Sequence, residues 1–172
     1  MAVRDIMYCV KNDEQLRRVS KPVLNFNDSL QILIEDMFET MYKFNGIGLS
    51  APQVGKNIRL FVVDIFKKKG DQFVLINPEI IKSKGITDSY EGCLSIPGVH
   101  AWIVRSKEIT VRALDRFGVY FEKSVNGLLA ECFQHEIDHL DGKLFIDFLS
   151  PLKQFLVRKK IKNILKNSKK YL

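Results

Sequence analysis

Two histidines and a glutamate fall within a short segment of the chain, between His135 and His139. On a helix, His135 and His139 lie one turn apart on the same face, so both imidazoles can bind one divalent metal ion. Glu136 lies beside them and can reach a metal-bound water. The alternative is a core helix that carries two histidines without a metal. The surrounding apolar residues recur at helical spacing and favour the metal site: Leu128, Leu129, Cys132, Phe133 and Leu140.

A hydrolytic metal centre of this kind needs a third protein ligand and one position left open for water. The position at which a metzincin has its third histidine holds Phe145. A thermolysin-like enzyme would use a downstream glutamate, yet no acidic residue follows Asp147. The third ligand must therefore come from upstream, where the soft or imidazole candidates are Cys9, Cys93, His100 and Cys132.

Of these candidates, Cys93 completes the site best. Cys132 lies on the same helix face as His135, and three ligands along one helix cannot surround a metal tetrahedrally, so we expect Cys132 to pack beneath the site. Cys9 lies in a polar N-terminal segment without a companion motif. A lone cysteine is usually a small buried hydrophobe. Next to an incomplete metal site, however, Cys93 predicts a Cys-His-His centre, and Gly92 before it permits a close approach of the backbone.

The elements that position these residues can be predicted from hydrophobic periodicity. The spacing predicts a first long helix over residues 28–44, with Asn27 or Asp28 as its cap. Asn126 can cap the metal-binding helix, and Gly142 can end it. The first helix is expected to bury Leu30, Leu33, Ile34, Met37, Phe38 and Met41.

Between residues 58 and 125 the pattern predicts short β-strands separated by turns. The predicted strands cover residues 59–64, 73–76, 80–81, 101–104, 109–114 and 119–125, with turns at 67–71 and 115–118. Short strands between helices indicate an α+β fold. We expect largely antiparallel β-sheets packed around a central metal-binding helix, with an N-terminal helix and a basic C-terminal helix.

The length of 172 residues fits one domain with a sizeable core. We expect residues 1–150 to form the catalytic domain and residues 151–172 to form a basic helix packed on it. Three cysteines without framework spacing suit a reducing cytoplasm rather than disulfides. No apolar run approaches the length of a membrane span, and the N-terminus lacks the apolar region of a signal peptide.

The net charge of +7 belongs to the C-terminal segment. Residues 151–172 contain eight Lys or Arg and no Asp or Glu, so the remaining 150 residues carry 19 basic and 20 acidic side chains. This distribution argues against a general nucleic-acid-binding fold. We expect the early apolar residues of the segment, Leu152, Phe155 and Leu156, to anchor it, because they point away from the face that carries Val157 and Ile161.

Three blocks of the sequence resemble the peptide deformylase family: residues 46–53, 91–95 and 134–139. Their order and separation also match, and the similarity spans about the whole chain. The resemblance implies a bacterial-type, metal-dependent hydrolase. Such an enzyme removes the N-terminal formyl group from the N-formylmethionine of newly synthesised polypeptides and releases formate.

The resemblance also implies roles for individual residues. Glu136 would exchange protons with the water and the leaving amine, while the Gln53 side chain and the Leu94 N–H would stabilise the developing oxyanion. The metal ligands would be Cys93, His135 and His139. Substrate would contact Ile47, Gly48, Gly92, Leu128, Glu131 and Cys132. Glu91 is expected to pair with Arg105 and to hold the cysteine loop in shape.

Two residues near the expected site depart from the family's usual pattern. Glu131, one turn before His135, is expected at the mouth of the methionine pocket with its carboxylate in water. His100 is expected to be a surface histidine on the outer substrate-binding rim.

The implied cofactor is one divalent metal ion per chain. A site of one thiolate and two imidazoles suits Fe²⁺, Zn²⁺, Ni²⁺ or Co²⁺ on ligand softness. The family resemblance favours Fe²⁺ as the physiological ion.

The implied partners are an N-formylmethionyl peptide and, through the basic C-terminal helix, the ribosome. No membrane partner and no sequence-specific nucleic-acid binding are expected. Two other functions remain open on the sequence: a His-Glu-x-x-His metallopeptidase, and a non-enzymatic, metal-stabilised ribosome-binding module. The first would cleave unblocked peptides, and the second would need a closed site with four ligands.

Overall fold

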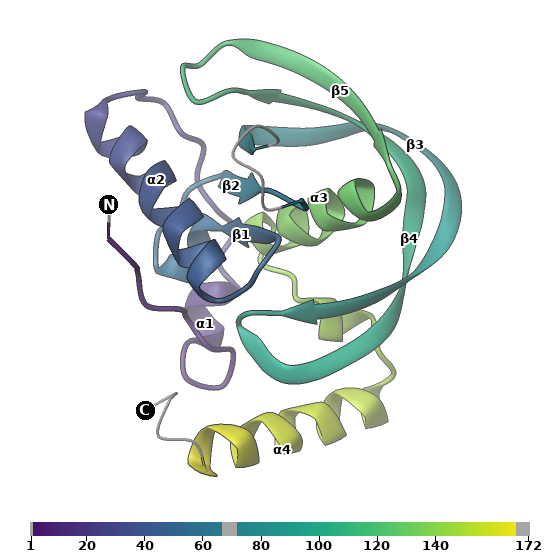
Figure 1. Ribbon diagram of the computed structural model, residues 1–172. Helices are drawn as coiled ribbons and strands as arrows, with labels where there is room; N and C mark the ends of the chain where they lie inside the picture. The colour runs from purple at the N-terminus through teal and green to yellow at the C-terminus, as the bar shows by residue number, and fades with distance from the viewer. Residues whose placement is uncertain (1, 67–71, 168–172) are drawn as a thin grey trace.

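The computed structural model describes residues 2–66 and 72–167, and it shows an α+β fold (Figure 1). This confirms the predicted fold class. The helices are α1 (Asp13–Leu16), α2 (Asp28–Lys43), α3 (Gly127–Leu140) and α4 (Pro151–Asn167), with 3₁₀ turns η1 (Ala51–Val54) and η2 (Phe145–Phe148). The strands are β1 (Gly48–Ser50), β2 (Leu60–Val63), β3 (Phe73–Cys93), β4 (Ile96–Leu114) and β5 (Tyr120–Asn126).

The five strands form one antiparallel sheet in the order β1-β2-β3-β4-β5. Strands β3 and β4 make a long hairpin that curves around α3, and α3 packs against β1, β2, β4 and β5 (Figure 1). Irregular register near Ile76, Ile80 and Gly92 accompanies this curvature, as expected of bulges. The curved sheet therefore surrounds the helix that carries the two histidines.

The prediction of many short strands is wrong, because β3 has 21 residues and β4 has 19. The outer positions of this hairpin carry polar side chains such as Lys82, Lys84 and Glu108, which interrupt the apolar pattern. Backbone pairing does not depend on those side chains, and it continues from Glu79 to Gly92. The turn predicted at 67–71 lies outside the described residues, whereas the turn at 115–118 is confirmed by the bond from the Gly118 N–H to the Asp115 carbonyl.

Helix α2 closes one side of the core. Its predicted cap is confirmed, because the Asn27 side chain accepts a hydrogen bond of 3.1 Å from the Leu30 N–H. All six residues predicted to be core are buried: Leu30, Leu33, Ile34, Met37, Phe38 and Met41. They pack with Leu49 of β1 and Val62 of β2, so α2 supports the strand that precedes η1.

Helix α3 is held by a second apolar cluster. The ring of Phe133 packs edge-on against Phe61 and Phe73, with centroid distances of 5.5 and 5.8 Å. The prediction that the Asn126 side chain caps this helix is wrong, since that side chain makes no capping bond where β5 runs directly into the helix. Gly142 follows the helix at φ +71, and a Cβ there would lie 2.3 Å from the Arg17 carbonyl oxygen. Only glycine fits this position.

Helix α4 packs below β4 (Figure 1). Its buried side chain is Ile161, in a cluster with Cys9 and Leu144. The prediction that the early apolar residues anchor the helix is wrong. The side chains of Leu152, Phe155 and Leu156 are exposed. The helix instead meets the body through its later turns. Residues 168–172 of the basic segment lie outside the described residues, and no described helix is long and apolar enough to cross a membrane.

Candidate active site

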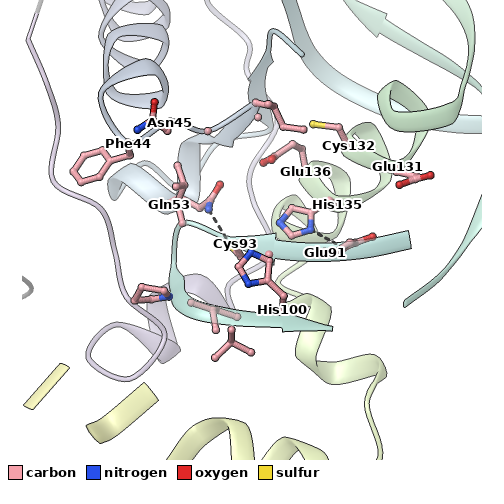
Figure 2. A pocket seen from close by; sticks show the side chains of 18 of the residues that line it. Phe44, Asn45, Gln53, Glu91, Cys93, His100, Glu131, Cys132, His135 and Glu136 are labelled. Atoms are coloured by element: carbon pink, nitrogen blue, oxygen red, sulfur yellow. Dashed lines mark hydrogen bonds and ion pairs between the residues drawn. The ribbon is translucent and has the colours of Figure 1, made fainter. Parts of the chain in front are cut away.

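Cys93, His135 and His139 come together between the end of β3 and the C-terminal half of α3, and Figure 2 shows Cys93 and His135 of this group. One ligand atom from each residue lies within 4.8 Å of the other two. The Cys93 Sγ is 3.3 Å from the His139 Nε2. Metal–ligand distances of 2.0–2.3 Å put tetrahedral ligand atoms about 3.3–3.8 Å apart, so this separation fits one shared cation. Among the described residues no fourth side chain joins the group.

The donor set has the charge and chemistry that a divalent metal needs. Burial lowers the pKa of His139 well below its usual value, which favours the neutral imidazole that binds metals. Burial also opposes a charge on His135, but hydrogen bonds to Cys93 and Glu91 outweigh it and raise the pKa of His135. Of these two neighbours, the Cys93 sulfur lies where the three ligand atoms meet, whereas Glu91 lies at the Nδ1 side of the His135 ring. The residues therefore fit a Cys-His-His metal centre.

A buried ion-pair network fixes the orientation of His135. Its Nδ1 lies 2.8 Å from a carboxylate oxygen of Glu91, which leaves Nε2 for the metal. Arg105 donates two hydrogen bonds to Glu91, of 2.6 and 2.9 Å, and a third of 2.6 Å to Asp138. Although burial opposes ionisation, the bonds from Arg105 and His135 lower the pKa of Glu91 to about 2. The expected pairing of Glu91 with Arg105 is confirmed.

Glu136 is placed to handle protons. Its side chain is buried on α3 next to His135, and within the described chain its Oε2 has no hydrogen-bond partner. Burial raises the pKa of this carboxyl to about 7, while the nearby His135 and a hydrogen bond with Ser50 act in the opposite direction. A buried carboxylate oxygen without a protein partner can accept a proton from a water molecule.

The amide nitrogen of Gln53 points at the sulfur of Cys93. The Ser50 N–H and hydroxyl each donate to the Gln53 Oε1 at 2.9 Å, within a capping box at the start of η1. The Gln53 Nε2 is thereby turned toward the Cys93 Sγ at 3.4 Å and the Ser95 hydroxyl at 3.2 Å (Figure 2). Leu94 lies in the two-residue turn that joins β3 to β4, directly after Cys93.

The candidate site opens into a cavity of ≈ 540 Å³. All six residues expected to contact substrate line it: Ile47, Gly48, Gly92, Leu128, Glu131 and Cys132. A Cβ on Gly48 would lie 2.5 Å from a Glu136 oxygen and 2.7 Å from the Cys132 Sγ. Glycine at position 48 thus lets β1 approach α3 closely. Cys132 packs under β1 and does not belong to the ligand group, as expected.

The carboxylate of Glu131 is expected to lie in water, but in the structure it also accepts a hydrogen bond from the protein. It lines the cavity, and it accepts a 2.7 Å hydrogen bond from the hydroxyl of buried Ser89. In Figure 2 Glu131 lies on α3 apart from Gln53 and Cys93. The cavity wall on this side is therefore partly polar.

Sequence reasoning missed three contributors to the site. Ser50 orients Gln53, Ser89 holds Glu131, and Tyr90 lines the cavity beside His100. The signal for Ser89 is strand alternation, because Ser89 and Glu91 share the inner face of β3. No sequence pattern indicates the contact of Ser50 with Gln53 except their capping-box spacing. His100 is exposed as expected, and its ring lies over Gly92.

The chain is similar to known proteins in both sequence and structure. The family described as "Polypeptide deformylase" matches residues 5–155. A curated peptide deformylase from Baumannia cicadellinicola subsp. Homalodisca coagulata is 51% identical over 155 residues, which is 90% of this chain and 93% of the relative. A solved peptide deformylase from Legionella pneumophila is 53% identical, covers 96% of both chains and has a TM-score of 0.92. That from Thermotoga maritima is 41% identical over 88% of this chain and 100% of its own, with a TM-score of 0.82.

Proposed function

Because the chain belongs to the polypeptide deformylase family, we propose that Glu136, Gln53 and the Leu94 N–H remove the formyl group from N-formylmethionyl peptides. In this hydrolysis water adds to the formyl carbon, the C–N bond breaks, and formate leaves. One observation supports this assignment of roles above all. Three potential metal-ligating atoms converge beside Glu136, whose Oε2 has no hydrogen-bond partner among the described residues, and Cys93, His135 and Glu136 all line one cavity.

Cys93, His135 and His139 are the residues that would hold the metal. A divalent cation bound there would lower the pKa of the attacking water. Glu136 takes the proton of that water and later gives it to the leaving amine, the general acid–base role. Its neighbour Glu91 does not share this role, because it is committed to Arg105 and His135.

Negative charge develops on the formyl oxygen during the attack. The Gln53 amide is already turned toward the Cys93 sulfur, and the Leu94 N–H follows Cys93 directly. Two donors held in place before the reaction stabilise this charge without reorganisation. Loss of one such donor lowers kcat about a hundred- to a thousandfold.

The peptide binds between β1 and the end of β3. Gly48 and Gly92 align its backbone, and β1 has a free edge because it is the terminal strand of the sheet. The methionine side chain enters the part of the cavity lined by Ile47, Leu128 and Cys132. Glu131, bound to Ser89, lies at the polar side of this pocket.

Formate release by the purified, metal-loaded protein tests the assignment. The substrate is formyl-Met-Ala, and the matched variant is Glu136→Ala. Unformylated Met-Ala-Ser, assayed for cleavage, tests the metallopeptidase alternative, which the comparisons do not favour. Cleavage of that peptide without formate release from formyl-Met-Ala would contradict the deformylase proposal.

We propose Fe²⁺ as the native metal, with Zn²⁺, Ni²⁺ and Co²⁺ able to replace it. The thiolate and two imidazoles suit each of these ions. If iron is native, activity is lost in air through oxidation of the iron or of Cys93. Metal analysis of protein purified without oxygen, and a comparison of activity with and without reductant, test this identity.

We propose that α4 contacts the ribosome. Its exposed Lys159, Lys160 and Lys162 form a basic surface that suits ribosomal RNA. Truncation is a poor test, because it would also remove the buried Ile161. Changing the three lysines to Glu keeps that anchor and should weaken co-sedimentation with ribosomes while turnover of formyl-Met-Ala persists.

Lys82→Glu/Lys84→Glu on β3 is the matched control, since both side chains are exposed and distant in sequence from α4. Unchanged sedimentation of the α4 variant would overturn the ribosome proposal.

We further propose that residues 1–150 form the catalytic domain, with residues 151–172 as a basic helix on the same domain, and that the protein acts in the cytoplasm. All three cysteines are free, and Cys93 must stay a thiolate to bind metal. A single cooperative unfolding transition reported by both Trp102 and a probe on α4 would support one domain. Two separate transitions would contradict it.

A further inference from the structure

The two carboxylate oxygens of Glu136 have different surroundings. A Cβ on Gly48 would lie 2.5 Å from Oε1, so this oxygen faces strand β1. Oε2 is buried and has no hydrogen-bond partner within the described part of the chain. Figure 2 shows the carboxylate extending from α3 toward the side on which Gln53 lies. A side chain of β1 that bonds Oε1 would therefore fix the position of Oε2.

Ser50 is the side chain of β1 that is placed to form this bond. Gly48 and Ser50 are two positions apart on the strand, so they share the face that meets Glu136. The Ser50 side chain is fully buried, and a buried hydroxyl is expected to have a hydrogen-bond partner. Although burial raises the pKa of Glu136 to about 7, a hydrogen bond with Ser50 acts to lower it. Because Oε2 has no partner, this bond belongs to Oε1.

The Ser50 hydroxyl is not required to orient Gln53. The backbone N–H of Ser50 already donates to the Gln53 Oε1 at 2.9 Å. The hydroxyl lies 2.9 Å from the same oxygen, but it carries a single proton and can rotate toward Glu136. The Gln53 oxygen keeps its backbone donor when the hydroxyl turns, and a hydrogen bond to an ionised carboxylate is the stronger of the two.

We propose that Ser50 is a positioning residue for Glu136: its hydroxyl donates to Oε1 and thereby holds Oε2 as the oxygen that takes the proton of the attacking water. This inference rests on the proposed function. Ser50 is not one of the described residues that line the cavity, so it acts through Glu136 and does not touch the substrate. Gly48 permits the arrangement, because a side chain at that position would displace Oε1.

The test begins with Ser50→Ala in the formate-release assay, with formyl-Met-Ala as substrate and kcat expressed per bound metal ion. We expect kcat to fall about five- to fiftyfold, the effect of losing one hydrogen bond to a charged group. KM should stay the same, because Ser50 does not contact the peptide. Ser20→Ala is the matched control: Ser20 is also buried, but its hydroxyl has no partner among the described residues. Its kcat should equal that of the unaltered protein.

Two double variants identify the residue through which Ser50 acts. In Glu136→Gln the proton acceptor is already gone, so adding Ser50→Ala should lower kcat by less than about twofold. In Gln53→Leu the oxyanion donor is gone but Glu136 remains. Adding Ser50→Ala there should still lower kcat about five- to fiftyfold, because the effects of independent sites are additive.

An unchanged kcat of Ser50→Ala, or a change confined to KM, overturns the proposal. Persistence of the full effect in Glu136→Gln also overturns it, as does loss of the effect in Gln53→Leu, since Ser50 would then act through Gln53. Failure of the proposed function looks different. In that case formyl-Met-Ala releases no formate even with the unaltered, metal-loaded protein.

Discussion

Helices α3 and α4 both carry charged and apolar side chains, but the two helices differ in how far these side chains are buried and bonded. On α3 the polar groups are buried and held: His135 bonds Glu91, and Asp138 bonds Arg105. On α4 the lysines are exposed, and so are Leu152 and Phe155.

Burying charge is unfavourable unless partners satisfy it, so α3 requires neighbours on β3 and β4 that also fix its geometry. Helix α4 has no such requirement. Chemistry is therefore expected to depend on α3, and surface contacts on α4.

The largest expected difference between the two helices is in turnover. Glu136→Gln keeps the size of the side chain but removes the proton acceptor, so kcat should fall about a hundred- to ten-thousandfold. On α4, Lys160→Gln should leave kcat unchanged because its side chain is exposed. Both values come from the formate-release assay, with metal content measured for each protein. Equal activity of Glu136→Gln and the unaltered chain would contradict the expectation that turnover depends on the polar side chains of α3.

The second difference is in stability. Arg105→Met leaves the buried Glu91 with His135 alone and removes the partner of the partly buried Asp138, which should lower the free energy of unfolding by about 3–5 kcal/mol. Arg158 of α4 is its control, because it is 40% exposed and lies 3.7 Å from Asp13. Arg158→Met should change the free energy by about 0–1 kcal/mol. Urea unfolding of both metal-loaded variants measures these free energies. Similar decreases for the two variants would show that the charged side chains of α4 stabilise the fold as much as those bonded to α3.

A third comparison lies within α4 itself. Ile161 is fully buried, whereas Leu156 is 54% exposed. Ile161→Ala should lower the free energy of unfolding by about 2–5 kcal/mol, and Leu156→Ala should change it by about 0.5 kcal/mol or less. The same urea titration applies. If the two substitutions lower the free energy of unfolding equally, the early turns of α4 anchor the helix after all.

The smallest effect concerns two buried thiols. Burial raises the pKa of Cys9 to about 11 and raises that of Cys132 well above its usual value. Both should therefore react slowly with iodoacetamide at pH 8, because the thiolate is the reactive form. Cys9 shares a cluster with Ile161, so Ile161→Ala should speed its alkylation and leave Cys132 on α3 protected. Mass spectrometry of peptides gives both rates, and equal acceleration of the two thiols would mean that α4 does not open separately.

Much of the site could be predicted from local sequence. Helical spacing places His135 and His139 on one face, and the absence of downstream ligands directs the search to Cys93. Capping and periodicity placed α2, because Asn27 and the apolar residues after it act within a few turns. Such signals are local, and the physical interactions behind them span only a few residues.

Strand length could not be predicted from that pattern. Residues 79–92 pair with β4 although several of their outer side chains, such as Lys82, Lys84 and Asp88, are polar, since the partner strand supplies the hydrogen bonds. Likewise the anchor of α4 is Ile161 rather than Leu152, because the helix meets the body through its later turns. Neither the length of β3 nor the anchoring residue of α4 can be predicted without the structure of the element that packs against it.

The sequence by itself determined the fold class, the helix that carries the two histidines and a set of candidate ligands, because residue type and periodicity act locally. Only the tertiary structure decided that Glu131 bonds Ser89, that Ser50 turns Gln53 toward Cys93, and that the stacked rings of Tyr90 and His100 line the cavity. These contacts join residues on different elements or depend on the exact course of a turn. Their partners are chosen by packing and burial, which no single stretch of sequence encodes.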